Sequence, residues 1–179
     1  MLARRVVAVI LRRAALFVVI VLMWALFAAA IAHAAPRDVV AFSGFAPGTI
    51  VVKTNERRLY FVLDSHRAMR FPVGVGKSGK TWTGVARVEG KFIRPAWSPP
   101  DEIRRDKPNL PEVIPGGSRL NPMGAAALTL RGGDYAIHGT NRPQSIGGFV
   151  SYGCIRMHNR DIVALYDMVQ VGTPVIVER

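Results

Sequence analysis

The sequence predicts a mainly β domain, a sandwich or a folded-over sheet, with one short helix near its C-terminus. Three observations lead to this fold class. Short runs rich in β-branched and aromatic residues recur from residue 49 onward, turn residues separate them, and helical periodicity occurs only after residue 158. Many short strands without alternating helices are typical of all-β architectures rather than of α/β folds.

The first predicted elements are a β-hairpin and a third strand. Thr49–Lys53 and residues 58–63 are β-rich runs on either side of a polar turn. The next run, 68–76, contains Pro72. Because proline cannot donate to a ladder of hydrogen bonds, we expect an edge or bulged position there.

The sequence pattern changes at Pro95, from alternating apolar and polar residues to a proline-rich stretch. Residues 84–94 alternate apolar and polar side chains, which predicts a half-buried strand or a pair of strands. The stretch from Pro95 to Pro122 then holds seven of the chain's 12 prolines. Because proline interrupts helices and ladders, we expect a long irregular excursion, of the kind that often covers or shapes a functional site.

Two further β segments and a closing strand are predicted near the C-terminus. Residues 125–130 and 135–138 are apolar runs joined by a glycine-containing turn, and residues 174–177 form the last run.

One helix is predicted between these segments. Asn159 is the expected N-cap, and Asp161 favours the positive end of the helix dipole. Gly172 suits a stop just beyond the helix. The apolar residues that recur at helical spacing are Ile162, Leu165, Tyr166 and Val169.

The N-terminus has the order of a secretory signal peptide. Four arginines and no acidic residue occupy residues 1–13, an apolar run of 19 residues follows, and small residues flank His33. We expect residues 1–35 to be a signal peptide cleaved near Ala34 or Ala35. The apolar run also approaches the ~20 residues of a membrane-spanning helix, so a retained N-terminal anchor is the alternative.

On either interpretation the rest of the chain lies outside the cytoplasm, and we expect it in the periplasm. Residues 36–47 are predicted to lead into a single domain at 48–178.

The exported part is basic. The chain has 24 Lys+Arg and 12 Asp+Glu, and removing four leader arginines leaves 20 − 12 = +8. Attraction to an anionic envelope polymer or membrane surface is one interpretation, and a merely basic surface is the other. Because no basic run exceeds two residues and the protein is expected to be exported, we expect no nucleic-acid partner.

Cys154 is the only cysteine of the chain, so it cannot form an internal disulfide. It is therefore a buried inert residue, an intermolecular link or a reactive thiol. The export signal and the glycine beside it, Gly153, favour a reactive nucleophile. A glycine leaves the approach to the thiol open and lets backbone amides turn toward one point, as an oxyanion hole requires.

His138 is the expected general base. It ends an apolar β segment 16 positions before Cys154, next to Gly139. His66 lies in a polar turn and His158 beside the helix start, so both are weaker candidates. One cysteine and scattered histidines without ligand spacing predict neither a metal nor a cofactor.

The residues around His138 and Cys154 resemble the signature of a known enzyme family. The His138–Asn141 stretch and the Ser151–Asn159 stretch, SYGCIRMHN, resemble the signature of the L,D-transpeptidase catalytic domain (YkuD type), in the periplasmic branch of these bacterial cell-wall enzymes. Residues 81–84 resemble the family's T-P-x-G turn, with Trp82 in place of proline. The likeness covers about residues 48–178 and implies a β-sandwich of mixed sheets with a short C-terminal helix.

The resemblance implies a cysteine acyl transfer on peptidoglycan. Cys154 would attack a tetrapeptide stem, release D-Ala and form a thioester. His138 would act as general base and acid, oriented by the backbone carbonyl of Gly139. The amides of Tyr152, Gly153 and Cys154 would form the oxyanion hole.

The remaining implied roles concern substrate binding. Arg156 would pair with a stem carboxylate, and we also assign Ser151 and Asn141 to the substrate. Many relatives carry histidine where this chain has Tyr152, so a second proton carrier is absent. Trp82 is expected to alter a loop and leave the chemistry untouched.

The expected partners are peptidoglycan stem peptides. The acceptor would be a neighbouring stem, a lysine of an outer-membrane lipoprotein, or water, which would make the enzyme an L,D-carboxypeptidase. The alternative function, which is binding rather than catalysis, is that of a non-catalytic wall-binding module with the same fold.

Overall fold

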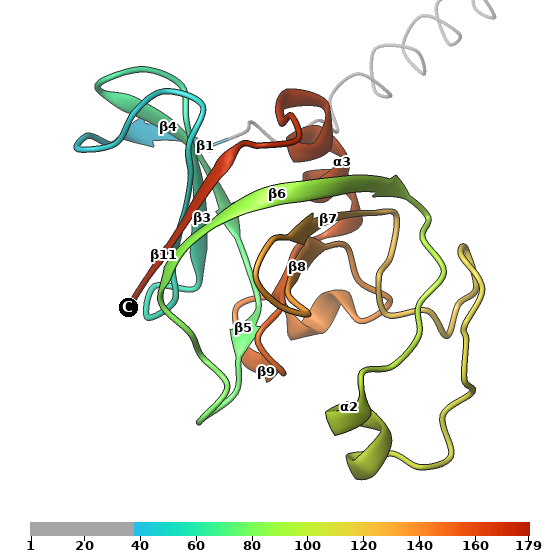
Figure 1. The fold of residues 1–179 in the computed structure, drawn as a ribbon. Helices are drawn as coiled ribbons and strands as arrows, with labels where there is room; N and C mark the ends of the chain where they lie inside the picture. The colour runs from blue at the N-terminus through green and yellow to red at the C-terminus, as the bar shows by residue number, and fades with distance from the viewer. Residues whose placement is uncertain (1–37) are drawn as a thin grey trace, which may run out of the picture. The chain divides into compact units, whose positions relative to one another are not determined.

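The computed structural model of the protein describes residues 38–179, and the predicted leader at 1–35 lies outside the described residues. The described chain is mainly β, as predicted (Figure 1). No helix within residues 38–179 is long and apolar enough to cross a membrane. The strands are β1 (Asp38–Ala41), β2 (Ile50–Lys53), β3 (Arg58–Val62), β4 (Arg67–Pro72), β5 (Val75–Gly76), β6 (Gly84–Ile93), β7 (Ala126–Leu130), β8 (Ala136–His138), β9 (Phe149–Ser151), β10 (Ile155–Arg156) and β11 (Pro174–Glu178). The helices are α2 (Asp101–Asp106), α3 (Asn159–Met168) and the 3-10 turn η1 (Pro143–Ser145).

Nine strands form one sheet in the order β1-β4-β3-β2-β11-β6-β7-β8-β10, and β5 pairs with β9. The long strand β6 joins the two halves of this sheet. Its first residues pair with β11, and its last residues pair with β7. The register shifts between Val88 and Gly90, and such a bulge bends a strand. The sheet therefore folds over, and β6 forms the arch visible in Figure 1.

The sheets are mixed, as the resemblance implied. β11 runs parallel to β2, β10 runs parallel to β8, and β5 runs parallel to β9, whereas the other pairs are antiparallel. The predicted hairpin is present, because β2 and β3 pair antiparallel with Ile50 opposite Phe61.

The main core lies between the two halves of the folded sheet. Because successive strand residues point to opposite faces, every second residue of β2 and β3 enters this core. Its buried members are Ile50, Val52, Leu59, Phe61, Met69, Phe71, Val73, Val75, Val88, Ala126, Leu128, Leu130, Ile137, Ile155, Met157, Ile162, Leu165, Val169, Val175 and Val177.

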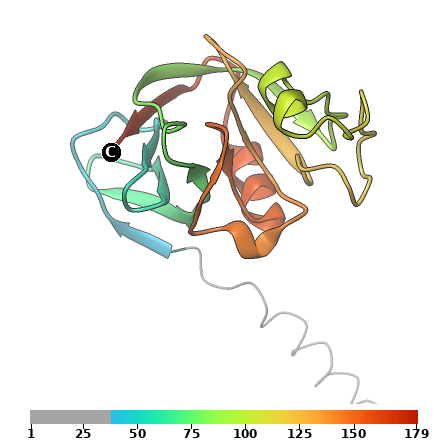
Figure 2. The ribbon, with the colours of Figure 1, turned by 90° about the horizontal axis from the view of Figure 1, so that it is seen from below.

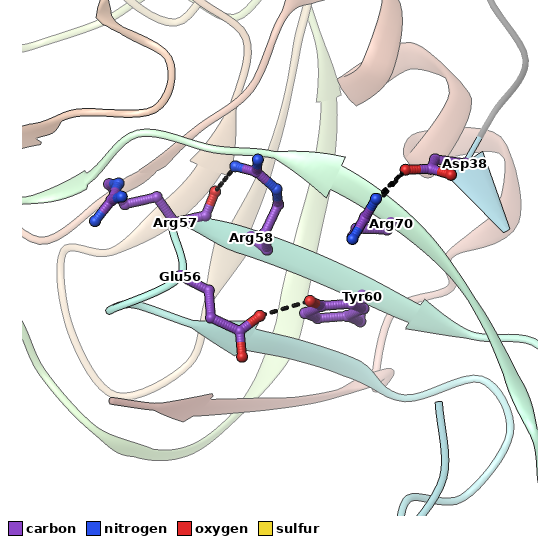
Figure 3. Close-up of polar contacts among 6 residues, drawn as sticks. All are labelled: Asp38, Glu56, Arg57, Arg58, Tyr60 and Arg70. Carbon is purple, nitrogen blue, oxygen red and sulfur yellow. Dashed lines mark hydrogen bonds and ion pairs between the residues drawn. The ribbon is translucent and has the colours of Figure 1, made fainter. Parts of the chain in front are cut away.

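A second, smaller core covers the opposite face of β2, β3 and β4. Phe42 stacks on Tyr60 with ring centroids 4.4 Å apart and on Phe45 at 5.4 Å. Figure 3 shows the polar contacts beside it, where Tyr60 donates to Glu56 at 2.6 Å and Arg70 pairs with Asp38.

Strand β1, which pairs with β4, was not predicted. The sequence predicts no helix or strand within residues 36–47. β1 has only four residues, and three of them are exposed, so it lacks the alternation of apolar side chains that indicates a strand.

Two other predictions need correction. The expected strand at 68–76 is two elements, because β4 ends at Pro72 and β5 joins the separate pair with β9. The proline-rich excursion is not wholly irregular, because it contains α2. The helix follows Pro100, and its first turn carries Asp101 and Glu102, which favour a helix N-terminus.

Helix α3 starts one residue earlier than expected. His158 is the N-cap and makes no side-chain capping bond, whereas Asn159 is the first helical residue. The helix packs on β7 and β8 and buries Ile162 and Leu165. Gly172, at φ +90°, shapes the turn into β11 rather than ending the helix.

Candidate active site

The strands β8 and β10 bring the two predicted catalytic residues together. They pair in parallel, with Ile155 opposite Ile137 and Arg156 opposite His138. Cys154 directly precedes β10. Because side chains alternate along strands and paired residues share a face, Cys154 and Arg156 lie on the His138 face of the sheet. All three line one cavity of about 920 Å³.

The His138 side chain is held by its own chain. It is buried, with 4% of its surface exposed, and its Nδ1 lies 2.7 Å from the Gly139 carbonyl. In the tautomer that donates from Nδ1, Nε2 carries the lone pair that can accept a proton. Burial, followed by the charge of Arg156, lowers the pKa of His138 to about 4. The imidazole is therefore neutral at neutral pH.

The same peptide unit is fixed from its other side. The Thr140 amide donates to Asn159 Oδ1 at 3.0 Å, and Oδ1 also accepts from the Ala125 amide at 3.0 Å. Asn159 Nδ2 donates to the Thr140 carbonyl at 3.0 Å. The Asn159 side chain therefore fixes the peptide whose carbonyl contacts His138.

The Cys154 thiol is desolvated. Its sulfur donates to the Asp134 carbonyl at 3.7 Å. Burial raises the pKa of the Cys154 thiol, against the opposing effects of the Ala136 amide and the Arg156 charge. The cavity therefore holds a neutral thiol and a neutral imidazole at neutral pH rather than a thiolate and an imidazolium.

Ser151 shapes the loop that carries the thiol. Its hydroxyl donates to the Cys154 carbonyl at 2.6 Å and accepts from the Gly153 amide at 3.1 Å. The side chain is buried. In this structure the Ser151 hydroxyl therefore bonds within the loop, and the Gly153 amide has an acceptor.

Two amides of the loop have no protein acceptor among residues 38–179, those of Tyr152 and Cys154. They are the remaining candidates for oxyanion donors. Gly153 has φ +122°, a conformation that favours glycine. A side chain there would also collide with the ring of Tyr135.

Arg156 is an unsatisfied cation in the cavity wall. Its Nε is the one buried side-chain nitrogen or oxygen without a hydrogen-bond partner in the described part of the chain. Burial lowers the pKa of the guanidinium. A buried donor without a partner costs free energy, and an incoming carboxylate would satisfy it.

Asn141 also lines the cavity. Its Nδ2 donates to the Arg119 carbonyl at 3.0 Å and so connects the segment after β8 to the excursion.

The excursion forms the opposite wall of the cavity, with Trp97, Asp101, Glu102 and Ile103 among its lining residues. Charged contacts fasten α2 to the rest of the domain. Lys80 pairs with Glu102, and Lys77 lies 3.7 Å from Asp106. The Tyr152 hydroxyl also donates to Asp106. Tyr152 thus contributes a wall contact that sequence reasoning missed.

Trp82 contacts the loop that carries Cys154. Its Nε1 donates to the Gly153 carbonyl at 3.0 Å, and its ring stacks on Tyr135 with centroids 5.0 Å apart and planes 7° apart. The only sequence signal was its replacement of proline in the family turn. The structure thus adds a contact between Trp82 and the loop before Cys154, whereas the expectation that Trp82 leaves the chemistry untouched stays a prediction.

Comparison with known proteins agrees with this architecture. The family model of the L,D-transpeptidase catalytic domain, YkuD, matches residues 47–177. The chain is 44% identical over 135 residues to ErfK/SrfK of Escherichia coli, described as a probable L,D-transpeptidase, covering 70% of this chain and 42% of that protein. It is 52% identical over 134 residues to YkuD of Bacillus subtilis, covering 74% of this chain and 67% of that protein.

Solved structures share the fold. An L,D-transpeptidase from Mycobacterium smegmatis superposes with a TM-score of 0.59 at 23% identity, covering 73% of this chain and 58% of that chain. The catalytic domain of the Enterococcus faecium enzyme, solved as the form acylated by ertapenem, gives a TM-score of 0.57 at 20% identity, with 75% and 99% covered. The chain spans less than half the length of the Escherichia coli relative. It belongs to the YkuD family of L,D-transpeptidase catalytic domains.

Proposed function

We propose that this protein is an exported L,D-transpeptidase that transfers an acyl group from a peptidoglycan tetrapeptide stem through a thioester on Cys154. The observation that supports it most directly is the register of β8 and β10, which places Cys154, His138 and Arg156 on one face in one cavity. Domain 48–178 carries the chemistry in this proposal.

The first half-reaction forms the thioester. His138 Nε2 accepts the thiol proton as sulfur attacks the carbonyl between the third residue of the stem and its terminal D-Ala. The amides of Tyr152 and Cys154 donate to the oxyanion that develops, a contact worth roughly 3–4 kcal/mol per donor. When the intermediate collapses, the C–N bond breaks and His138 gives its proton to the departing amine of D-Ala.

The second half-reaction resolves the thioester. An acceptor amine forms a C–N bond, the C–S bond breaks, and the amine proton passes through His138 to the sulfur. The acceptor is the amine of a neighbouring stem or the lysine of an outer-membrane lipoprotein. With water in its place the product is a free acid, and the enzyme is an L,D-carboxypeptidase.

Arg156 binds the donor in this proposal. The Arg156 Nε is buried without a hydrogen-bond partner, and buried donors normally have one. Stem peptides carry free carboxylates that could accept this hydrogen bond. Asn141, on the same cavity wall, is the second proposed contact to the substrate. Gly139 acts only through its carbonyl, which orients His138.

The experiment incubates the purified full chain with disaccharide tetrapeptide and weighs the products. A cross-linked dimer with released D-Ala identifies transpeptidation, and a tripeptide alone identifies the carboxypeptidase. A Cys154→Ala variant should form neither. If the wild-type protein leaves the substrate intact, takes no ertapenem adduct and still sediments with sacculi, the wall-binding module replaces the enzyme.

The mass of the protein itself, measured in each cell fraction, tests the proposed location. Protein recovered from the periplasm with its mass reduced by residues 1–34 or 1–35 would indicate a cleaved signal peptide. An intact chain in the membrane fraction would indicate the retained anchor.

A further inference from the structure

The indole of Trp82 makes a long-range contact with the loop that carries the thiol. Trp82 lies in the connection between β5 and β6, two strands that Figure 2 shows from below. Its Nε1 donates to the carbonyl of Gly153, 71 residues further along the chain, at 3.0 Å. The accepting carbonyl belongs to the residue just before Cys154.

The ring of Trp82 is itself fixed by packing. It lies nearly parallel to Tyr135, with planes 7° apart, and it packs against the main core. The ring of Tyr135 occupies the space that a side chain at Gly153 would need. The indole N–H therefore meets Gly153 from a rigid position.

The contact fixes both ends of one peptide unit. The carbonyl of Gly153 and the amide of Cys154 belong to the same planar trans peptide, so they point in opposite directions. Because Trp82 holds the carbonyl, the Cys154 N–H is directed away from the indole.

Little else restrains that peptide. Gly153 adopts φ +122°, where glycine moves among conformations more freely than other residues. Ser151 binds the Gly153 amide and the Cys154 carbonyl, which belong to the two neighbouring peptides. Among the described contacts, Trp82 makes the one hydrogen bond to the peptide between Gly153 and Cys154.

We infer that Trp82 is a positioning residue that holds the Cys154 amide in place as an oxyanion donor. The inference rests on the proposed acyl transfer and deepens it. Trp82 is not among the residues that line the cavity, so in this inference it acts through the orientation of one peptide.

The test compares two reactions of the same thiol. Acylation by imipenem passes through an oxyanion, whereas alkylation by iodoacetamide displaces iodide at a saturated carbon and forms none. In Trp82→Phe, which keeps an aromatic ring against Tyr135 but lacks the N–H, we expect acylation to slow roughly 10- to 100-fold. The alkylation rate should stay within about twofold of wild type, because the thiol and His138 keep their places.

A second variant separates the effect of the lost N–H donor from the effect of a changed ring shape. β-(3-benzothienyl)alanine inserted at position 82 keeps the size and stacking of indole but has no N–H donor. It should show the same selective loss of acylation. Tyr60→Phe is the matched control, because it removes one aromatic donor, the bond to Glu56, on the opposite face of the sheet.

Each result decides the inference. Equal losses in both reactions would make Trp82 a structural residue and overturn it, as would unchanged acylation in both variants. In either case an acylated wild-type protein would leave the proposed function standing. A wild-type thiol that alkylates but that imipenem does not acylate would overturn the proposed function and this inference together.

Discussion

At the scale of single residues, burial moves the pKa values of the two proposed reacting groups apart. It raises the pKa of the Cys154 thiol and lowers that of His138 to about 4. At neutral pH the proton therefore stays on sulfur, and in the proposed mechanism the neutral imidazole accepts it. A neutral pair limits side reactions of the thiol, since the thiolate is the reactive form.

A pH profile follows from this arrangement. The imidazole must be neutral to accept a proton, so single-turnover acylation by imipenem should rise through an inflection near the His138 pKa of about 4. It should then be level from about pH 5 to 7, because the base form already dominates there. An inflection near the ordinary histidine value would contradict the desolvated site.

The second cause of the shift can be tested separately. The Arg156 charge lowers the pKa of His138, so Arg156→Gln should move the inflection to higher pH. Arg131→Gln is the matched control, because this exposed arginine lies outside the cavity and should leave the inflection in place.

At the scale of elements, the site depends on very short strands held by larger neighbours. β8 has three residues and β10 has two, so neither is stable by itself. α3 packs on β7 and β8, and its first residue, Asn159, hydrogen-bonds the segments after β8 and before β7. This side chain connects the helix to the peptide that orients His138.

Removing the Asn159 side chain should therefore be costly. Asn159→Ala leaves two amides and one carbonyl without their partner, and we expect a loss of about 2–4 kcal/mol in the free energy of unfolding. Arg160→Ala, at the next and exposed helix position, should change it by less than about 0.5 kcal/mol. Denaturant titration of both variants measures the difference, and equal values would contradict the connecting role of Asn159.

At the scale of the whole molecule, the two ends of the described chain meet in one sheet. β11, the last strand, lies between β2 and β6 and pairs with both. Without it the half-sheet of β1 to β4 would lose the strand that joins it to β6 and the rest of the sheet.

A truncation tests this arrangement. Deleting residues 174–179 exposes the edges of β2 and β6 and removes the buried Val175 and Val177, so no cooperative unfolding transition should remain. Deleting Arg179 alone, which is exposed, should leave the transition unchanged. A folded domain after the larger deletion, seen by circular dichroism, would show that β11 is dispensable.

The sequence by itself determined the mainly β class, the hairpin of β2 and β3 and the late helix, and it singled out Cys154 and His138, which both line one cavity. These features are local, or they are carried by a motif whose residues lie within a few positions of one another. The alternation of apolar residues in β2 and β3 and the helical spacing of Ile162 and Leu165 are properties of short stretches of chain.

Only the tertiary structure decided the contacts that join distant segments. The bond from Trp82 to Gly153 spans 71 residues, and the pairing of β1 with β4 depends on a neighbour rather than on its own pattern. The lowered pKa of His138 likewise results from burial by several elements. Such effects arise where segments that are distant in sequence lie close in space. The sequence pattern does not give the spatial distance between those segments.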